Sequence, residues 1–278
     1  MSAALNDPTT LGYRSALCSL AGVPRASAYR DRRGPASVCM AQDALASQVE
    51  SVACDWADYG YRRVTAELGR RGIKVGWRRV LGIMREKNLL CRRKKRFVST
   101  TDSSHTQRIY PNLKPSISLV RVGQLWVADM TYIRVPQGFV YLAVVPDAYS
   151  RKAVGWAMSE RIDTDLTLSA LTMALDKRGA PLYHHSDRGS QYASAEYVAE
   201  LSGHQVQMSM SRTANPYDNA GMESFMKTLK YEEVHRADYK TIEDAWTGID
   251  RFMMVYNDLR LHSALGYVPP TEFENEQR

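Results

Sequence analysis

Residues 181–192 read PLYHHSDRGSQY, and residues 210–234 read MSRTANPYDNAGMESFMKTLKYEEV. The first stretch predicts a short buried strand that ends at Ser186-Asp187, followed by the flexible Arg188-Gly189-Ser190. The second predicts a turn over residues 215–219 and then a helix, with Glu223 in its first turns. Asp187 and Glu223 are separated by 35 residues. Two acidic side chains are therefore expected at a strand end and at a helix start.

A third carboxylate lies in an upstream strand. Residues 124–133 read QLWVADMTYI, which predicts a central strand that is mostly apolar on both faces, with Asp129 in its middle. A buried, unpaired carboxylate costs on the order of several kcal/mol, so Asp129 needs a partner. Oxygen ligands suit Mg²⁺ or Mn²⁺, and two such ions about 3.5–4 Å apart can promote phosphoryl transfer. Asp129, Asp187 and Glu223 are therefore the candidate metal ligands and catalytic residues, although each acid taken alone can equally be a surface group that caps a turn.

Charge is divided unevenly along the chain. The 278 residues carry a net charge of +7, but residues 1–118 have 21 Lys and Arg against 9 Asp and Glu, whereas residues 119–278 have 16 against 21. A basic half joined to an acidic half indicates a nucleic-acid-binding arm attached to a metal-binding catalytic body. The alternative is a solvated basic surface with no ligand.

Within the basic half, residues 45–97 predict a compact helical unit. Helical spacing covers residues 41–59, 61–70 and 75–87. The predicted DNA contacts are the outward basic residues of the last helix and the run after it: Arg78, Arg79, Arg92, Arg93, Lys94, Lys95 and Arg96. Such a unit can enter a major groove and hold phosphates, and the alternative is a basic spacer that touches only the DNA backbone. Residues 11–33 predict either a second helix-turn-helix or a bare helical hairpin.

The acidic half predicts an α/β core over residues 119–278. Expected strands cover residues 125–135, 139–146, 153–158, 182–185 and 206–210, and expected helices cover 164–178, 195–201 and 242–259 besides the helix of Glu223. Residues 99–118 are aperiodic and predict a linker after the basic region 1–98. Pro146 has no N–H to donate, so it is expected to end or kink the second strand early.

Three motifs in combination resemble the DDE transposases of the retroviral-integrase superfamily. They are Trp126-x-x-Asp129-x-Thr131-Tyr132, the run HSDRGSQY over residues 185–192, and Asp218-Asn219-Ala220-x-x-Glu223-Ser224-Phe225. The interval of 35 residues before the glutamate is the hallmark of that superfamily. More narrowly, residues 45–275, including the tail YNDLRLHSALGYVPP at 256–270, are similar to the second-reading-frame product of a large bacterial insertion-sequence family, family three.

The resemblance implies both a fold and an activity. The fold is a ribonuclease-H-like integrase core, an α/β mixed five-stranded sheet with flanking helices, preceded by a small all-α helix-turn-helix region. The activity is cleavage at the ends of an insertion element to free a 3′ hydroxyl, which then attacks another phosphodiester in double-stranded DNA. Two Mg²⁺ or Mn²⁺ ions per active site, a homo-oligomer on DNA and a partner protein from an upstream reading frame are implied as well. The alternatives are a catalytically inactive DNA-binding regulator and a simple ribonuclease-H-like nuclease.

Two lysines follow Glu223 on the same helix. Lys227 and Lys230 lie four and seven positions after it, so all three residues share one helical face. By the resemblance, both lysines hold phosphates of the DNA being cut. The alternative is a pair of solvated lysines, one of them paired with Glu223.

Other polar residues of the motifs have two possible roles. His184 and His185 either position the substrate and relay protons or serve as satisfied structural histidines. Gln191 and Asn219 are candidates to hydrogen-bond DNA or the waters around the metal site. In the tail, which is expected to be mostly architectural, Arg260 and His262 are the candidate DNA contacts.

The remaining composition excludes several classes. Cys18, Cys39, Cys54 and Cys91 are far apart and show no paired spacing with histidine, which argues against a zinc site and a disulfide framework. No apolar signal core and no window of membrane-spanning length is present. The protein is therefore expected in the bacterial cytoplasm, associated with the nucleoid and not with a membrane.

Overall fold

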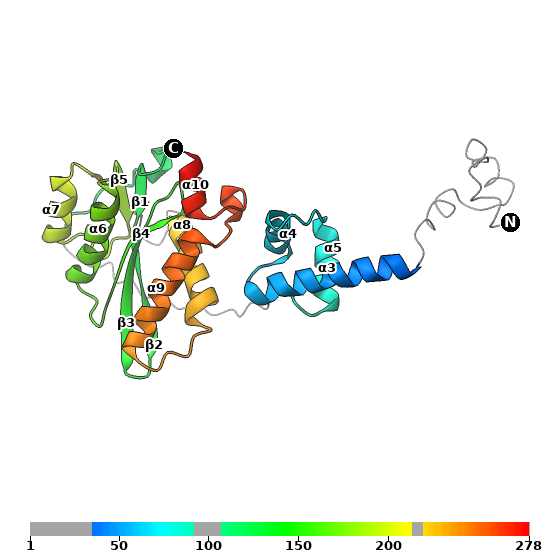
Figure 1. Cartoon of the computed structure of the whole chain (residues 1–278). Coiled ribbons are helices and arrows are strands. Elements are labelled where there is room, and N and C mark those ends of the chain that lie inside the picture. The colour runs from blue at the N-terminus through cyan, green and yellow to red at the C-terminus, as the bar shows by residue number, and fades with distance from the viewer. Residues whose placement is uncertain (1–34, 92–106, 213–218, 278) are drawn as a thin grey trace, which may run out of the picture. The chain divides into compact units, whose positions relative to one another are not determined.

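The computed structural model describes residues 35–91, 107–212 and 219–277, and the side chains from residue 43 onward (Figure 1). The chain divides into two compact units, Met1–Arg93 and Lys94–Arg278. Several sequence predictions lie outside the described residues. These are the helical hairpin at 11–33, the basic run Arg92, Arg93, Lys94, Lys95 and Arg96, and the first part of the linker at 99–106.

The described part of the first unit contains three helices, α3 (Pro35–Asp55), α4 (Tyr61–Arg70) and α5 (Trp77–Glu86). The prediction for α4 is confirmed, α5 is shorter than predicted by a few residues, and α3 begins earlier and ends sooner. Apolar residues at helical spacing meet between the three helices: Val49, Val52, Val64, Leu68, Val80 and Met84 are all fully buried. Burying one stripe per helix leaves the opposite faces, including Arg78 and Arg79 on α5, exposed to solvent.

The second unit is built on six strands: β1 (Leu125–Val127), β2 (Asp129–Val135), β3 (Gly138–Pro146), β4 (Ala153–Ser159), β5 (Tyr183–Ser186) and β6 (Gln207–Met210). In the described chain, β2, β3 and β4 pair antiparallel, while β1, β5 and β6 pair parallel in the order β1-β5-β6. The single strand predicted at 125–135 is divided at Ala128 into β1 and β2. An antiparallel bridge from Trp126 to Asp147 joins β1 to the end of β3. The predicted mixed sheet is thus confirmed, with a break at the acidic residue of its central strand.

Helices cover both faces of this mixed sheet (Figure 1). They are α6 (Thr164–Arg178) and α7 (Ala195–Gly203) on one side, and α8 (Ala220–Leu229) and α9 (Ile242–Asp258) on the other. Neighbouring residues of β3 alternate between the layers: Ala143 packs with α6, and Val144 packs with α8 and α9. Gly155 on β4 permits close approach of α6, because a Cβ there would lie 2.2 Å from the carbonyl oxygen of Ala170. The three residues of β1 are all buried, whereas the first four residues of β2, Asp129–Tyr132, are only half-buried.

The strand predicted at residues 139–146 is β3, and it ends at Pro146 as expected. β3 stops at Pro146, and its register with β4 shifts between Val145 and Pro146. Asp147 then closes the turn: its Oδ1 accepts hydrogen bonds from the backbone N–H groups of Tyr149 and Ser150, at 2.9 and 2.8 Å, and its Oδ2 accepts from Gly123 at 2.7 Å. Burial raises the pKa of Asp147, while these three donors favour its charged form. Asp147 is therefore an architectural carboxylate.

Segments after the sheet hold the core together. Asn257 in α9 uses its side-chain amide to accept from the N–H of Ala153 at 2.9 Å and to donate to the carbonyl oxygen of the same residue at 3.0 Å. Arg260 makes a bidentate ion pair with Glu232, and both contacts are 2.6 Å long. Glu232 lies in the π-helical turn η4 (Lys230–Val234). The short helix α10 (Pro270–Glu276) closes the described chain. The described part of the predicted linker also contacts the core, since Leu113 N–H donates to Ser209 Oγ at 2.9 Å and Ile117 packs beside α8 and α9.

No helix within the described residues is long and apolar enough to span a membrane. Cys54 and Cys91 are exposed, and Cys18 and the side chain of Cys39 lie outside the described part.

Candidate active site

Asp129 stands where the central strand breaks. The backbone N–H of Ala128 donates to the carbonyl oxygen of His185 at 2.8 Å, which is the last contact between β1 and β5 before Asp129. The Oδ1 atom of Asp129 accepts from the N–H of Met130 at 2.8 Å. Burial, followed by the charge of Asp187 and that of Glu223, raises the pKa of Asp129 to about 7. The fold therefore holds a carboxyl group where its negative charge is costly.

Asp187 reaches the same edge of the sheet through β5. Because β1 and β5 are parallel, with Val127 opposite His185, the residues that follow both strands emerge together. Asp187 Oδ1 accepts from the N–H of Gly189 at 2.9 Å. A Cβ on Gly189 would lie 3.0 Å from that oxygen, so this tight turn favours glycine. Asp129 and Asp187 line one cavity of about 500 Å³.

Glu223 is carried by the first turn of α8. Met222, Phe225 and Leu229 on this helix are buried against the sheet, which leaves Glu223 exposed on the other side of the helix. Its charge contributes to the raised pKa of Asp129, so it acts on the same site from a third element. Within the described residues, no three His, Cys, Asp or Glu side chains are close enough together to hold a metal ion. The two aspartates therefore form the compact part of the site.

The two lysines of this helix have different surroundings. Lys227 is exposed in the last turn of α8. Lys230 is half-buried: its Nζ donates to the carbonyl oxygen of Tyr132 at 2.7 Å and lies 4.4 Å from the centre of the Tyr132 ring. Burial lowers the pKa of Lys230. Lys230 thus contacts the strand that carries Asp129, an interaction that helical spacing alone did not predict.

Both histidines beside Asp187 are buried and hydrogen-bonded. His184 Nε2 lies 3.0 Å from the hydroxyl of Tyr197 in α7, and burial lowers the pKa of His184 to about 3. His185 lies 2.8 Å from Ser209 Oγ through Nδ1 and 3.0 Å from Ser211 Oγ through Nε2. These contacts attach β5 to its neighbours and so orient the strand that ends at Asp187.

The other candidate polar residues divide between the site and the scaffold. Gln191 lies in the cavity beside Asp187 and donates to the carbonyl oxygen of Ile162 at 3.4 Å. Asn219 precedes α8, and its buried Oδ1 has no hydrogen-bond partner within the described residues. Arg260 pairs with Glu232, and His262 is buried with its Nε2 3.3 Å from the carbonyl oxygen of Tyr256. The tail is therefore architectural, as expected.

The apolar wall of this cavity was not predicted from the sequence. Its aromatic side chains come from facing positions of β2 and β3: Tyr132, Phe139 and Tyr141. The signal that could have revealed this wall is the pair of aromatic residues at alternate positions of the predicted strand 139–146, Phe139 and Tyr141.

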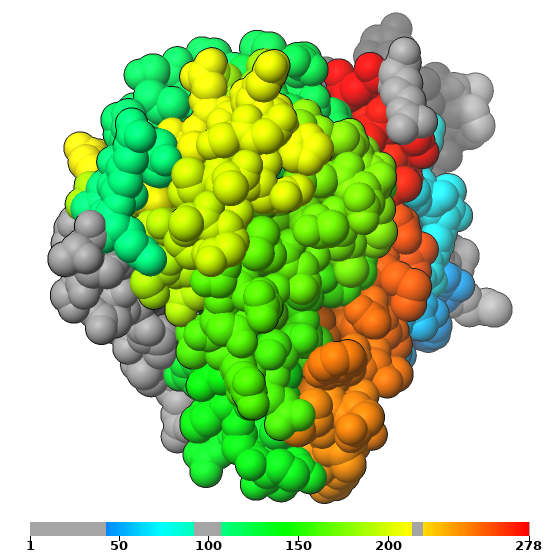
Figure 2. Space-filling model, turned by 90° about the vertical axis from the view of Figure 1, so that its left-hand side faces the viewer, coloured from blue at the N-terminus to red at the C-terminus, as the bar shows by residue number. Residues whose placement is uncertain are grey.

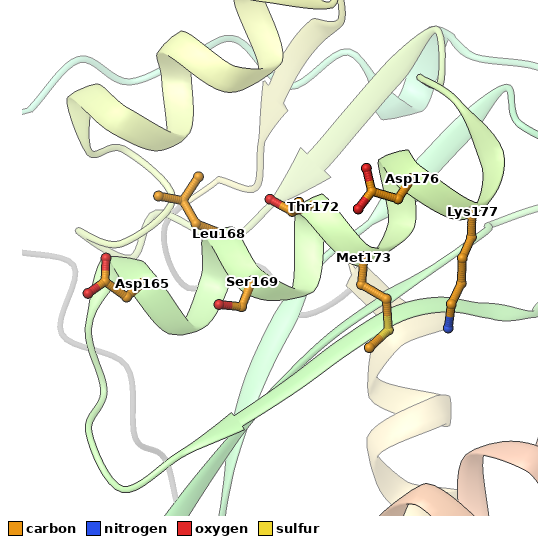
Figure 3. Close-up of a pocket in the computed structure, with 7 residues that line it drawn as sticks. All are labelled: Asp165, Leu168, Ser169, Thr172, Met173, Asp176 and Lys177. Atoms are coloured by element: carbon orange, nitrogen blue, oxygen red, sulfur yellow. The ribbon is translucent and has the colours of Figure 1, made fainter.

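A second and separate hollow, of about 630 Å³, follows one side of α6 (Figure 3). All its lining residues come from that single helix: Asp165, Leu168, Ser169, Thr172, Met173, Asp176 and Lys177. The two aspartates stand at opposite ends of the row in Figure 3, so they do not form a paired acidic site. This hollow contains none of the residues that the motifs indicate as catalytic.

Three family models match the chain, and together they cover parts of both units. Two models described as "Integrase core domain" match residues 120–216 and 204–270, and a third, "HTH-like domain", matches residues 41–97. The HTLV-2 integrase catalytic core domain, solved in complex with magnesium, covers 55% of this chain and 97% of its own, with 16% identity and a TM-score of 0.44. The family matches and the mixed sheet with flanking helices define the class: an enzyme with an integrase catalytic core, of the polynucleotidyl transferase superfamily.

Similar proteins identify the family within this class. The "Insertion element IS600 uncharacterized 31 kDa protein" of Shigella sonnei is 41% identical over 224 residues, covering 78% of this chain and 82% of that protein. The "Transposase InsF for insertion sequence IS3A" of Escherichia coli is 36% identical over 222 residues, covering 78% and 77%. The chain belongs to the IS3 family of DDE transposases, which cleave and integrate DNA.

Proposed function

We propose that Asp129, Asp187 and Glu223 hold two Mg²⁺ or Mn²⁺ ions when DNA is bound, with Asp129 between the other two acids. The observation that carries this proposal is the crowding of negative charge around the half-buried Asp129: Asp187 lines the same cavity, and burial, the charge of Asp187 and that of Glu223 together raise the pKa of Asp129. An all-oxygen donor set suits hard divalent ions, which would relieve that crowding. When bound, the ions would supply activation of the attacking oxygen and charge stabilisation at the leaving oxygen.

The chain's own residues then position the DNA strand. Asp187 is held by the Gly189 turn and Glu223 by the anchored helix α8, so the acids approach a phosphodiester from two elements. Exposed Lys227 is placed to hold a flanking phosphate, and Lys230 supports the strand of Asp129 while adding positive charge beside it. His185, Gln191 and Asn219 are assigned the lesser role of orienting the acids and the waters around them.

The basic region 1–98 is proposed to bind the element ends, with the linker 99–118 leading to the core 119–278. Arg78 and Arg79 are exposed near the start of α5, and the Tyr61 and Trp77 rings lie 5.6 Å apart beside them. An exposed helix start with arginines fits a groove and its phosphates. Arg92, Arg93, Lys94, Lys95 and Arg96 extend the same charge along the sequence. We expect homo-oligomers on DNA, a partner from an upstream reading frame, and action at the bacterial nucleoid in the cytoplasm.

The testing experiment incubates the full-length protein with duplexes of its own element ends and Mg²⁺. Joined ends are the expected product, whereas Asp129→Asn protein should bind the same duplexes and join nothing. Cleavage to hydrolysed ends without joining would indicate a nuclease, and binding without cleavage by the unsubstituted chain would indicate a regulator. Deleting residues 1–98 should remove most duplex affinity and reduce the salt slope by about 0.9 for each phosphate that the shortened chain no longer neutralises.

A further inference from the structure

The cavity beside Asp129 and Asp187 is only partly acidic. Its volume is about 500 Å³, within the range of about 300–1,000 Å³ that is usual for small-molecule sites. Away from the two acids it is lined by Met130, Tyr132, Phe139, Tyr141, Ile162 and Gln191. The proposed metal chemistry uses none of the apolar side chains, so this part of the cavity needs a separate explanation.

The aromatic side chains are left uncovered by the way the sheet extends. Tyr132 and Tyr141 are opposite one another in the β2–β3 register, and Phe139 lies two residues from Tyr141 on the same face. Farther along that face Ala143 is buried under α6, but the hairpin runs on past the helix (Figure 1). Phe139 is consequently 48% exposed, and green residues of this part of the chain reach the lower end of the molecule in Figure 2, beside orange residues from nearer the C-terminus. An aromatic ring so exposed beside a catalytic centre is available to a ligand.

Positive charge borders the aromatic surface. Lys230 lies 4.4 Å from the centre of the Tyr132 ring, and exposed Arg134 is opposite Phe139 in the strand register. The rings of Tyr132 and Phe139 meet edge to face, with centroids 5.4 Å apart, which leaves part of each ring face free of the other. Aromatic faces for a base, cations for phosphates and acids for a metal-bound phosphodiester together match a nucleotide strand.

We propose that this aromatic pocket takes one unpaired base of the DNA, adjacent to the phosphodiester held at Asp129 and Asp187, and stacks it on Phe139 and Tyr141. The proposal rests on the proposed function, because only a strand held at these acids places its next nucleotide in the pocket. Removing a base from the duplex costs free energy, and stacking on aromatic side chains offsets part of that cost. Every base has a π-face, so the pocket accepts any base.

The first experiment locates the base by photocrosslinking. Duplexes of the element end carry 5-iododeoxyuridine at one position at a time on each side of the cleaved bond, and the protein is the full-length Asp129→Asn variant, which does not cut. We expect one position to crosslink to Phe139 or Tyr141, identified by mass spectrometry of the digested complex. No crosslink to either residue at any position would overturn the proposal, even if the unsubstituted protein joins ends normally.

The second experiment measures the contribution of the aromatic ring. Phe139→Ala should reduce joining of paired ends about 10-fold, which corresponds to about 1.4 kcal/mol, while Phe139→Tyr should join at nearly the original rate. A mismatch that already unpairs the crosslinked base should restore much of the rate lost in Phe139→Ala. Trp246→Ala is the matched control, because Trp246 on α9 is equally exposed at 48% and does not line the cavity.

The outcomes separate this proposal from the proposed function. If the unsubstituted protein joins ends and Phe139→Ala joins them equally fast, the base site is wrong and the transposase chemistry stands. If the unsubstituted protein joins nothing, the proposed chemistry fails, while the crosslink still reports on the base. If Phe139→Ala instead abolishes self-association, and no base crosslinks to Phe139 or Tyr141 in the Asp129→Asn protein, the hairpin face is a contact between protein chains and the proposal is overturned.

Discussion

The ammonium group of Lys230 donates a 2.7 Å hydrogen bond to the carbonyl oxygen of Tyr132, three residues after Asp129 on the same strand. The contact joins the end of α8, the helix of Glu223, to the strand of the first acid. Since Lys230 also lies over the Tyr132 ring, one lysine stabilises the relative position of two catalytic elements.

Lys230→Met should therefore lower both stability and joining. The substitution keeps the alkyl stem but removes the hydrogen bond and the cation–π contact, a loss of about 1–2 kcal/mol. Thermal unfolding followed by circular dichroism should show a lower Tm. Lys227→Met is the control, because exposed Lys227 should affect affinity for DNA ends and its salt dependence without changing the Tm. Equal Tm values for both variants would contradict the supporting role of Lys230.

Asp129→Asn should stabilise the protein at pH 8 in the absence of divalent metal. The pKa of Asp129 is raised to about 7 in the folded chain from an unfolded value of 3.8, so the stability associated with its neutral form is lost as the pH rises through that window. The amide removes the buried charge and should raise the Tm at pH 8, with the gain shrinking toward pH 4. Added Mg²⁺ should raise the Tm of the unsubstituted protein more than that of the variant. A Tm of Asp129→Asn below that of the unsubstituted protein at pH 8 would refute the crowding of charge at this site.

His184 should make the protein sensitive to acid. Burial lowers its pKa to about 3 from 6.5, so the unfolded chain binds a proton in this window before the folded chain does. The contribution of neutral His184 to the free energy of unfolding is fully present above pH 6.5. It is lost toward pH 3, by up to about 1.4 kcal/mol for each pH unit in between. His184→Gln, measured by urea unfolding from pH 7 to pH 4, should flatten this dependence even if it costs stability at pH 7. An unchanged slope would show that other groups cause the acid sensitivity.

The pair of Arg260 and Glu232 should be worth more than an ordinary surface ion pair. Arg260 is only 4% exposed, and both of its contacts with Glu232 are 2.6 Å long. Arg260→Met leaves Glu232 without its guanidinium partner in a partly buried place, for which a loss of about 3–5 kcal/mol is expected. In the double variant with Glu232→Gln, the loss should be smaller than the sum of the single losses, measured by denaturant unfolding. Arg260→Lys should recover only part of the stability, because lysine lacks the bidentate geometry.

Much of the fold was predictable because its signals are local. Helical spacing located α4 and α6 to the residue. The missing N–H at Pro146 was sufficient to predict the end of β3. The break at Ala128 was not predictable, because β1 pairs with β5, which is distant in the sequence, while β2 pairs with the neighbouring strand β3.

The sequence by itself determined the candidate residues for the chemistry of this protein: three acids at a strand, a strand end and a helix start, with a basic region before them. The tertiary structure decided what surrounds those acids. Side chains from separate elements bury Asp129, engage both nitrogens of His185, attach Lys230 to Tyr132 and leave Phe139 uncovered beside the site. Such properties depend on burial and on through-space distance between residues far apart in the chain, and no local pattern of residues encodes either.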